Sequence, residues 1–163
     1  MIGEGGLEAV LDEAALRDWG SAVGRAVEVP GAFALSGDLG AGKSVLARAI
    51  ARGRGVTGML PSPTFNLVLH HQAHGAEVVH IDLYRVHDPG ELWELGLADL
   101  GGATQLLLIE WAERAGTLLP EPRWDVHLEH VPGRAELRRV RARTVGGAPP
   151  LPSFPDAPTP TMP

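Results

Sequence analysis

The sequence predicts an α/β fold in which helices flank a central, mostly parallel sheet. Two segments carry this prediction. Residues 31–36, Gly-Ala-Phe-Ala-Leu-Ser, form a short apolar run that leads directly into a glycine-rich turn and a helical pattern. Residues 105–110, Gln-Leu-Leu-Leu-Ile-Glu, are mostly apolar and close on a carboxylate, which is typical of a parallel strand buried on both faces.

Before residue 88 the chain alternates strand and helix patterns. Residues 7–11 suit a short strand, and Asp12 is a suitable N-cap for the helix that follows. After the strand at residues 31–36, a second helix is expected to begin at residues 42–43. Residues 66–71 and 77–84 are then expected to form an antiparallel hairpin that extends the sheet.

Beyond this hairpin the pattern continues with two helices and two strands. Residues 88–101 are expected to form a helix, because Asp88 is a good N-cap and a proline follows it at the first helical position. Residues 111–115 begin another expected helix. Residues 124–131 and 136–143 suit strands on either side of a Pro-Gly turn.

Length and composition are those of one globular domain. The chain has 163 residues, 44% of them hydrophobic and 21% charged, and it has no cysteine, which excludes disulfides and thiolate metal sites. Seven of the 15 residues from Pro149 onward are proline. We therefore assign residues 1–147 to the folded domain and expect residues 148–163 to be a disordered, proline-rich tail.

Charge and hydropathy narrow the function classes. The formal net charge of −6 argues against unaided, non-specific binding of nucleic acid. No run approaches the 18 apolar residues of a membrane span, and the first residues lack a signal-peptide pattern. We expect a cytoplasmic protein that does not act at a membrane.

Residues 37–44, Gly-Asp-Leu-Gly-Ala-Gly-Lys-Ser, match the phosphate-binding pattern G-x-x-x-x-G-K-[ST]. Glycines allow a backbone that brings N–H groups close to an anion, and a helix beginning at residues 42–43 directs its positive dipole end there. Lys43 is the only lysine among 14 basic residues, and it stands where a compact ammonium is needed. The expected nucleotide contacts are Gly37, Asp38, Leu39, Gly40, Ala41, Gly42, Lys43 and Ser44. The fold prediction becomes a three-layer, P-loop NTPase-like domain.

Two acidic residues complete the predicted site. Glu110 closes an apolar strand at its carboxyl end, where ligands bind in open α/β sheets, so we assign it with Ser44 to Mg²⁺. Asp82 also follows a strand, and we assign it to the γ-phosphate side, where it would order the attacking water. Lys43, Asp82 and Glu110 are the expected catalytic residues. Guanine recognition of the [NT]-K-x-D type needs a second lysine, so ATP is the expected nucleotide.

Other polar residues leave alternatives open. Thr64 follows two prolines in a stiff loop and is either a γ-phosphate sensor or an ordinary turn hydroxyl. Arg85 either supplies a positive charge at the transition state or, as the favoured interpretation, forms a structural ion pair. The histidines lack metal-ligand spacing. Four arginines near the end of the domain suit a solvated strand edge or, as the minority interpretation, an RNA or partner contact; they are Arg138, Arg139, Arg141 and Arg143.

Four blocks in order resemble the TsaE (YjeE) family, the small ATPase of bacterial tRNA threonylcarbamoyladenosine (t6A) biosynthesis: G-D-L-G-A-G-K-S (37–44), S-P-T-F (62–65), H-I-D-L-Y-R (80–85) and E-W (110–111). The resemblance covers about residues 7–143. It implies slow hydrolysis of ATP in support of the TsaB–TsaD complex, and contact with tRNA only through that complex.

The resemblance also implies roles for single residues. Asp82 would be needed for hydrolysis, Thr64 would lie in a nucleotide-sensing switch, and Trp111 would follow the metal-binding acid in a second switch. Ser44 replaces the family's usual threonine and keeps the hydroxyl, whereas Asn66 stands where the family often has threonine. Two other functions use the same loop: a small-molecule kinase, and a nucleotide-dependent binding module that does not hydrolyse.

Overall fold

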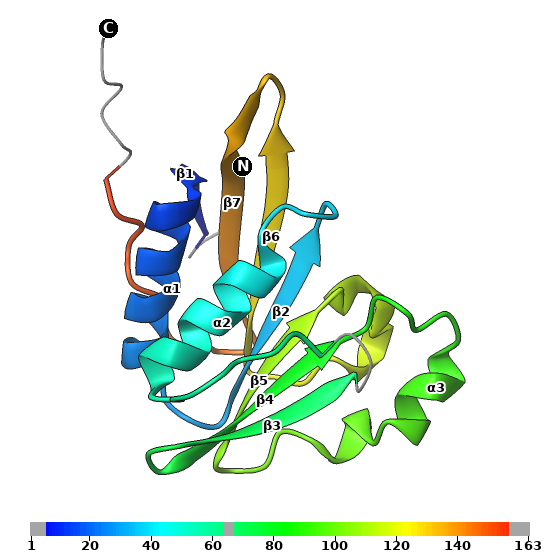
Figure 1. Ribbon diagram of the computed structural model, residues 1–163. Helices are drawn as coiled ribbons and strands as arrows, with labels where there is room; N and C mark the ends of the chain where they lie inside the picture. Colours follow the sequence, from blue (N-terminus) through cyan, green and yellow to red (C-terminus); the bar gives the residue numbers. More distant parts are fainter. Residues whose placement is uncertain (1–5, 64–66, 157–163) are drawn as a thin grey trace, which may run out of the picture.

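The computed structural model describes residues 6–63 and 67–156, which form a seven-stranded sheet with helices on its two faces (Figure 1). The strand order is β1-β7-β6-β2-β5-β4-β3. The strands are β1 (Leu7–Asp12), β2 (Gly31–Gly37), β3 (Val68–Ala73), β4 (Ala76–Asp82), β5 (Gln105–Glu110), β6 (Arg123–Val131) and β7 (Arg134–Val145). The four central strands, β6, β2, β5 and β4, run parallel to one another. The pairs β3–β4, β6–β7 and β1–β7 are antiparallel. The predicted fold class, including the hairpin extension, is confirmed.

Helices α1 (Glu13–Ala26) and α2 (Lys43–Arg54) lie side by side on one face of the sheet (Figure 1). Asp12 caps α1 as expected, because its Oδ1 accepts a hydrogen bond of 2.8 Å from the Ala15 N–H. The two helices touch at backbone level: a Cβ on Gly24 would lie 2.1 Å from the Ile50 carbonyl oxygen. A glycine is therefore required at this contact. No helix in the described part of the chain is long and apolar enough to cross a membrane.

The second face carries shorter elements than we expected. Helix α3 spans only Pro89–Glu94, because Gly96 adopts a left-handed conformation (φ 70°) and ends the predicted 88–101 helix early. A 3₁₀ turn follows at Leu97–Asp99. The helix predicted from residue 111 is instead a pair of 3₁₀ turns at Ala112–Arg114 and Gly116–Leu118.

The core lies on both faces of the central strands. Alternate residues of β2 and β5 contribute to two apolar clusters, as expected for parallel strands covered on both sides. One cluster, under α1 and α2, contains Phe33, Leu35, Leu106 and Leu108; the other contains Ala32, Ala34, Leu107 and Ile109. This burial holds the carboxyl ends of β2, β4 and β5 in fixed positions next to one another.

The prediction of a disordered tail is wrong for residues 148–156. This segment has no regular secondary structure, but it packs on the cluster under α1 and α2. The Trp19 indole N–H donates to the Pro152 carbonyl at 3.0 Å, and the Trp124 indole N–H donates to the Pro149 carbonyl at 2.8 Å. Phe154 lies with its ring centroid 4.4 Å from that of Trp19. Two buried tryptophans thus find acceptors for their indole N–H groups in this segment.

Candidate nucleotide site

The segment between β2 and α2 has the backbone geometry that a phosphate-binding loop needs. Gly37, Gly40 and Gly42 all have positive φ, at 122°, 75° and 112°. Gly37 also lies directly against β6, where a Cβ would meet the Leu128 carbonyl oxygen at 1.9 Å. Helix α2 begins at Lys43, so the free N–H groups of its first turn face the loop. A nonglycine residue at these positions would strain or displace the loop.

Lys43 is buried inside this loop, with 4% of its surface exposed. Its Nζ donates to the carbonyl oxygens of Gly37 and Asp38, both at 2.8 Å, and lies 4.0 Å from the centroid of the Trp111 ring. Burial lowers the pKa of Lys43, and the nearby Glu113 and Glu110 carboxylates partly offset this effect. A desolvated ammonium of this kind attracts phosphate oxygens strongly.

Glu110 connects α2 to the neighbouring strands. Its Oε1 accepts a hydrogen bond of 2.6 Å from the Ser44 hydroxyl, and its Oε2 lies 2.5 Å from His80 Nε2 on β4. His80 and Glu110 are each only 2% exposed. Both carboxylate oxygens are therefore engaged, one by the helix and one by the sheet.

Asp82 lies beside Glu110, because the two residues are register partners at the carboxyl ends of β4 and β5. The Tyr84 backbone N–H donates to Asp82 Oδ1 at 2.9 Å. Burial is the main cause that raises the pKa of Asp82, and the Glu110 carboxylate adds to it, while the Tyr84 hydrogen bond opposes it. Lys43, Ser44, Asp82 and Glu110 thus meet at one edge of the sheet.

The oxygen atoms of Ser44 and Glu110 suit Mg²⁺, which favours oxygen ligands and usually takes few of them from the protein. A hydroxyl has one proton and two lone pairs, so Ser44 can donate to Glu110 and still offer a lone pair to a cation. The 2.6 Å contact between the two side chains is therefore compatible with the predicted metal position. Phosphate oxygens and water would supply the other ligands.

Aromatic residues border the site, and the sequence reasoning assigned a role only to Trp111. Trp111 has a left-handed backbone (φ 57°), and its ring lies 4.9 Å from that of Tyr84. The Arg114 guanidinium lies 5.6 Å from the centroids of both rings and donates to the Val86 carbonyl at 2.9 Å. His80 and Tyr84 were also missed, although the block H-I-D-L-Y-R contains both.

Two predicted roles stay predictions. Thr64, with the expected sensor function, lies outside the described residues. Arg85 is described and is exposed, and neither of its two expected roles is tested by its position.

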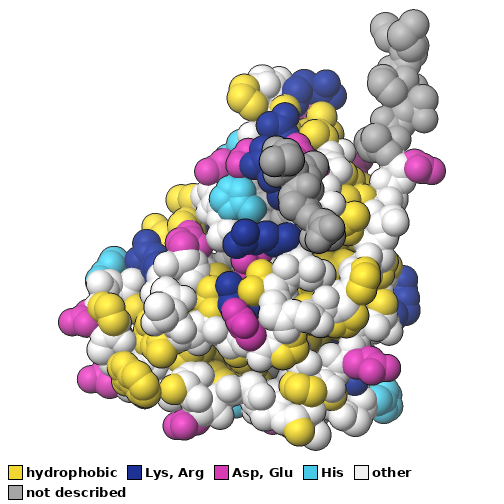
Figure 2. Space-filling model, turned by 180° about the vertical axis from the view of Figure 1, so that it is seen from behind, with side chains coloured by type: hydrophobic (Ala, Val, Ile, Leu, Met, Phe, Trp, Pro, Cys, Tyr) yellow, Lys and Arg dark blue, Asp and Glu magenta, His cyan; other side chains and the backbone are white. Residues whose placement is uncertain are grey.

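Three of the four late arginines take part in ion pairs on the sheet face that points away from α1 and α2. We call this the polar sheet face; it comprises Glu8, Asp125, His127, Glu129, Arg139, Arg141 and Arg143. Arg141 pairs with Glu129 at 2.8 Å and with Glu8 at 3.1 Å, and Arg143 pairs with Asp125 at 2.7 Å. Arg139 lies 3.5 Å from Glu8. Basic and acidic side chains are interspersed on this side of the molecule (Figure 2).

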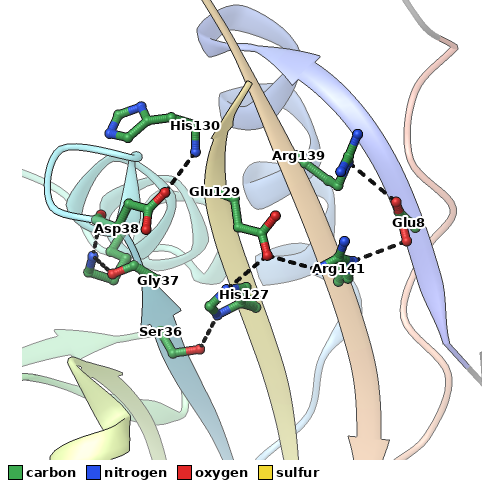
Figure 3. A network of polar contacts seen from close by, with 10 residues as sticks. Glu8, Ser36, Gly37, Asp38, His127, Glu129, His130, Arg139 and Arg141 are labelled. Atoms are coloured by element: carbon green, nitrogen blue, oxygen red, sulfur yellow. Dashed lines mark hydrogen bonds and ion pairs between the residues drawn. The ribbon is translucent and has the colours of Figure 1, made fainter. Parts of the chain in front are cut away.

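The same network reaches β2 (Figure 3). His127 Nδ1 lies 2.8 Å from the Ser36 hydroxyl, one residue before the loop, and His127 Nε2 lies 3.3 Å from Glu129. A hollow of about 830 Å³ is lined by Ser36 and His127 and bordered by Ala112 and Leu119. Because its charges are already paired, this face favours the solvated-edge interpretation over an RNA contact.

Arg138 differs from the other three arginines. It lies on the opposite sheet face, and its Nη1 is 3.2 Å from the place that a Cβ of Gly42 would take. Its Nε is buried and has no hydrogen-bond partner among the described residues. The late arginines are thus split between an ion-paired face and the flank of the loop.

Comparisons with known proteins identify the family of this chain. The family model described as "Threonylcarbamoyl adenosine biosynthesis protein TsaE" matches residues 10–140. The chain is 36% identical over 112 residues to the tRNA threonylcarbamoyladenosine biosynthesis protein TsaE of Haemophilus influenzae, a match that covers 69% of this chain and 71% of that one. For the Rickettsia conorii protein of the same name, identity is 43% over 97 residues, covering 58% of this chain and 54% of the relative.

A solved structure has the same fold. The crystal structure of Bacillus subtilis YdiB superimposes with a TM-score of 0.67 at 23% identity, covering 87% of this chain and 86% of that one. This likeness concerns the fold, while the family match spans both the loop and the two acidic strand ends. The chain belongs to the TsaE family of threonylcarbamoyl adenosine biosynthesis proteins.

Proposed function

We propose that this protein binds ATP with Mg²⁺ and hydrolyses it slowly, and that this activity supports threonylcarbamoyl transfer to adenosine 37 of tRNA in a complex with TsaB and TsaD. One observation carries the ATPase part of the proposal. A buried ammonium, a serine hydroxyl and two strand-end carboxylates converge on the start of α2; they are Lys43, Ser44, Asp82 and Glu110. This is the set of groups that phosphoryl transfer requires.

The loop would hold the β- and γ-phosphates. Main-chain N–H groups of residues 37–44 donate to phosphate oxygens, and the N-terminal end of α2 adds a positive dipole. Lys43 exchanges the carbonyl oxygens of Gly37 and Asp38 for phosphate oxygens, which are better partners for an ammonium because they carry charge.

Hydrolysis would depend on the two carboxylates. Mg²⁺ would neutralise the charge that develops on the transferred phosphoryl group. Ser44 and Glu110 would hold that ion, while Asp82 would order the attacking water and accept its proton. The raised pKa of Asp82 suits a proton acceptor, because it brings the carboxylate closer to the pH at which it works.

Phosphate release tests the ATPase and separates it from the alternatives. We expect slow, steady release of phosphate from ATP that disappears in Lys43→Ala and falls sharply in Asp82→Ala and Glu110→Ala. Arg141→Ala, on the polar sheet face, is the matched control and should keep the rate. No release by the wild-type protein would favour the binding module, and transfer of phosphate to a metabolite hydroxyl would favour the kinase.

Reconstitution tests the pathway. The family match supports a place in t6A biosynthesis, and the TsaB–TsaD partnership follows from the resemblance of the sequence blocks. TsaB, TsaD, threonylcarbamoyl-adenylate and tRNA are mixed with and without this protein and ATP, and t6A is counted over many turnovers. We expect turnover beyond the first round only with both added; equal turnover without the protein would contradict the proposal.

A further inference from the structure

Glu110 must be held in one orientation if it is to serve a metal at the start of α2. Its carboxylate is 2% exposed, so water cannot satisfy it and protein donors must do so. Ser44 donates to Oε1 at 2.6 Å. The donor for Oε2 is His80, which no role in the proposed chemistry explains.

The donor in the contact between His80 and Glu110 follows from the charge state of the Glu110 carboxylate. A carboxylate that serves a metal is ionised and only accepts hydrogen bonds, so in that state His80 Nε2, 2.5 Å from Oε2, is the donor. His80 stands two residues before Asp82 on β4, and Asp82 pairs in register with Glu110. His80 and Glu110 are therefore diagonal neighbours on one sheet face, and the rigid backbone of two central strands sets their separation.

We propose that His80 is a positioning residue that holds Glu110 Oε2 and thereby aims Oε1 at Ser44 and at the magnesium position. Without this donor the carboxylate can rotate or turn its second oxygen toward Ser44, and the metal ligand is lost. The role is that of an outer-shell partner, whose loss usually weakens metal binding about 10- to 100-fold. The inference rests on the proposed function, because it concerns the metal of that same site.

Side-chain length gives a sharp test. In His80→Gln the amide nitrogen is as many bonds from Cβ as the histidine Nε2, so the donor still reaches Glu110. In His80→Asn the same amide is one methylene shorter and falls short of Oε2. His71→Asn is the matched control, since His71 is a partly buried histidine on the neighbouring strand β3 with no hydrogen bond to Glu110.

The measurement is the affinity for Mn²⁺, followed by electron paramagnetic resonance, in the presence of a non-hydrolysable ATP analogue. Binding of the analogue in EDTA is measured beside it, because this binding depends on the loop and Lys43 alone. We expect His80→Asn to bind Mn²⁺ about 10- to 100-fold more weakly than wild type, and His80→Gln and His71→Asn to stay within about threefold of it. Binding in EDTA should be unchanged in all three.

Three results would overturn the inference. Mn²⁺ affinity of His80→Asn equal to that of wild type would remove the positioning role and leave the ATPase proposal standing. If both His80 variants lost Mn²⁺ binding and also lost binding of the ATP analogue in EDTA to the same extent, His80 would have a general structural role instead. Absence of metal-dependent analogue binding in the wild-type protein would overturn the proposed function and this inference together.

Discussion

Polar side chains gather in two regions of this molecule under opposite physical conditions. At the carboxyl ends of β2, β4 and β5, Lys43, His80 and Glu110 are 4%, 2% and 2% exposed. On the polar sheet face, Arg141 and Arg143 keep 45% and 70% of their side-chain surface exposed while forming ion pairs. Buried polar groups depend on every partner, whereas water replaces a lost partner at the surface.

The two regions differ in whether their charged groups already have strong partners. In the exposed network, each carboxylate already pairs with an arginine or lies close to a histidine. In the buried cluster, the Lys43 ammonium can still bind a ligand, because its present partners are carbonyl oxygens of its own loop, which are weaker acceptors than phosphate. Substitutions should therefore cost far more function in the buried cluster than on the polar sheet face.

The largest expected effect is that of Lys43→Met on ligand stabilisation. ATP and Mg²⁺ at about 100 times Kd should stabilise the wild-type protein by about 2.7 kcal/mol, or roughly 5–10 °C in Tm. The variant should show no such shift in thermal denaturation. A shift equal to that of wild type would remove Lys43 from the phosphate site.

The same variant tests the cost of burying the ammonium. Burial lowers the pKa of Lys43, so its protonated form is less favourable in the folded than in the unfolded chain. Without ligand, the stability of wild type relative to Lys43→Met should therefore rise as pH approaches the ordinary lysine pKa, because the folded chain releases its proton first. Urea denaturation of both proteins across this alkaline range measures the change, and a relative stability that falls with pH would contradict a lowered pKa.

Next in size is the effect of Asp82→Asn on hydrolysis. We expect the rate to fall about 100-fold or more, as for loss of a general base, with ATP affinity kept within about threefold. In the wild type the rate should rise with pH through the pKa of Asp82, which burial holds above its ordinary value of 3.8. Asp125→Asn, on the polar sheet face, should leave the rate and its pH profile unchanged.

Linkage gives Asp82 a stability signature of definite sign. The folded chain binds the proton of this carboxyl more tightly than the unfolded chain does, so the contribution of Asp82 to stability falls as pH rises from its ordinary to its raised pKa. Urea denaturation of wild type and Asp82→Asn across this acidic range measures the difference. A difference that grows in the opposite direction would mean that the pKa of Asp82 is lowered.

A smaller effect, on the free energy of unfolding, is expected for the C-terminal segment that packs against Trp19 and Trp124. Removal of all residues after Ala148 should cost about 2–3 kcal/mol, because two indole N–H groups lose their acceptors and Phe154 leaves Trp19. Urea denaturation measures this loss, and Phe154→Leu should show only part of it. Unchanged stability after truncation would return the segment to the disordered class.

The smallest effect belongs to the polar sheet face. A double-mutant cycle on Arg143 and Asp125, which lie 2.7 Å apart, should give a coupling of about 0.2–1 kcal/mol that weakens with added salt. Neither single variant should alter phosphate release. A coupling above about 2 kcal/mol, or a loss of activity, would show that substitutions on the polar sheet face matter as much as those in the buried cluster.

The sequence was most informative where local rules act. The glycine pattern, the single lysine and the carboxylate after an apolar run depend on residue type and spacing, and the structure brings the loop, Ser44 and Glu110 together. Their roles toward a nucleotide stay predictions. Predictions were wrong where tertiary contacts decide. Gly96 ends α3 early, and Trp19 and Trp124 bind a tail that its proline content marks as disordered.

His80 shows the same limit within the site. In the sequence it is one of seven histidines without metal-ligand spacing. Only the pairing of β4 with β5 brings it to Glu110 across 30 positions of the chain. Contacts between strands that are distant in sequence cannot be read from spacing along one segment.

Calorimetric titration of ATP into the wild-type protein with Mg²⁺ tests whether the 37–44 loop holds a triphosphate. We expect saturable heat of binding at one site, with affinity about 10- to 100-fold lower in Lys43→Ala, because the charged partner of the phosphates is gone. No heat of binding with the wild-type protein, or equal affinity in the variant, would contradict a triphosphate held by the 37–44 loop.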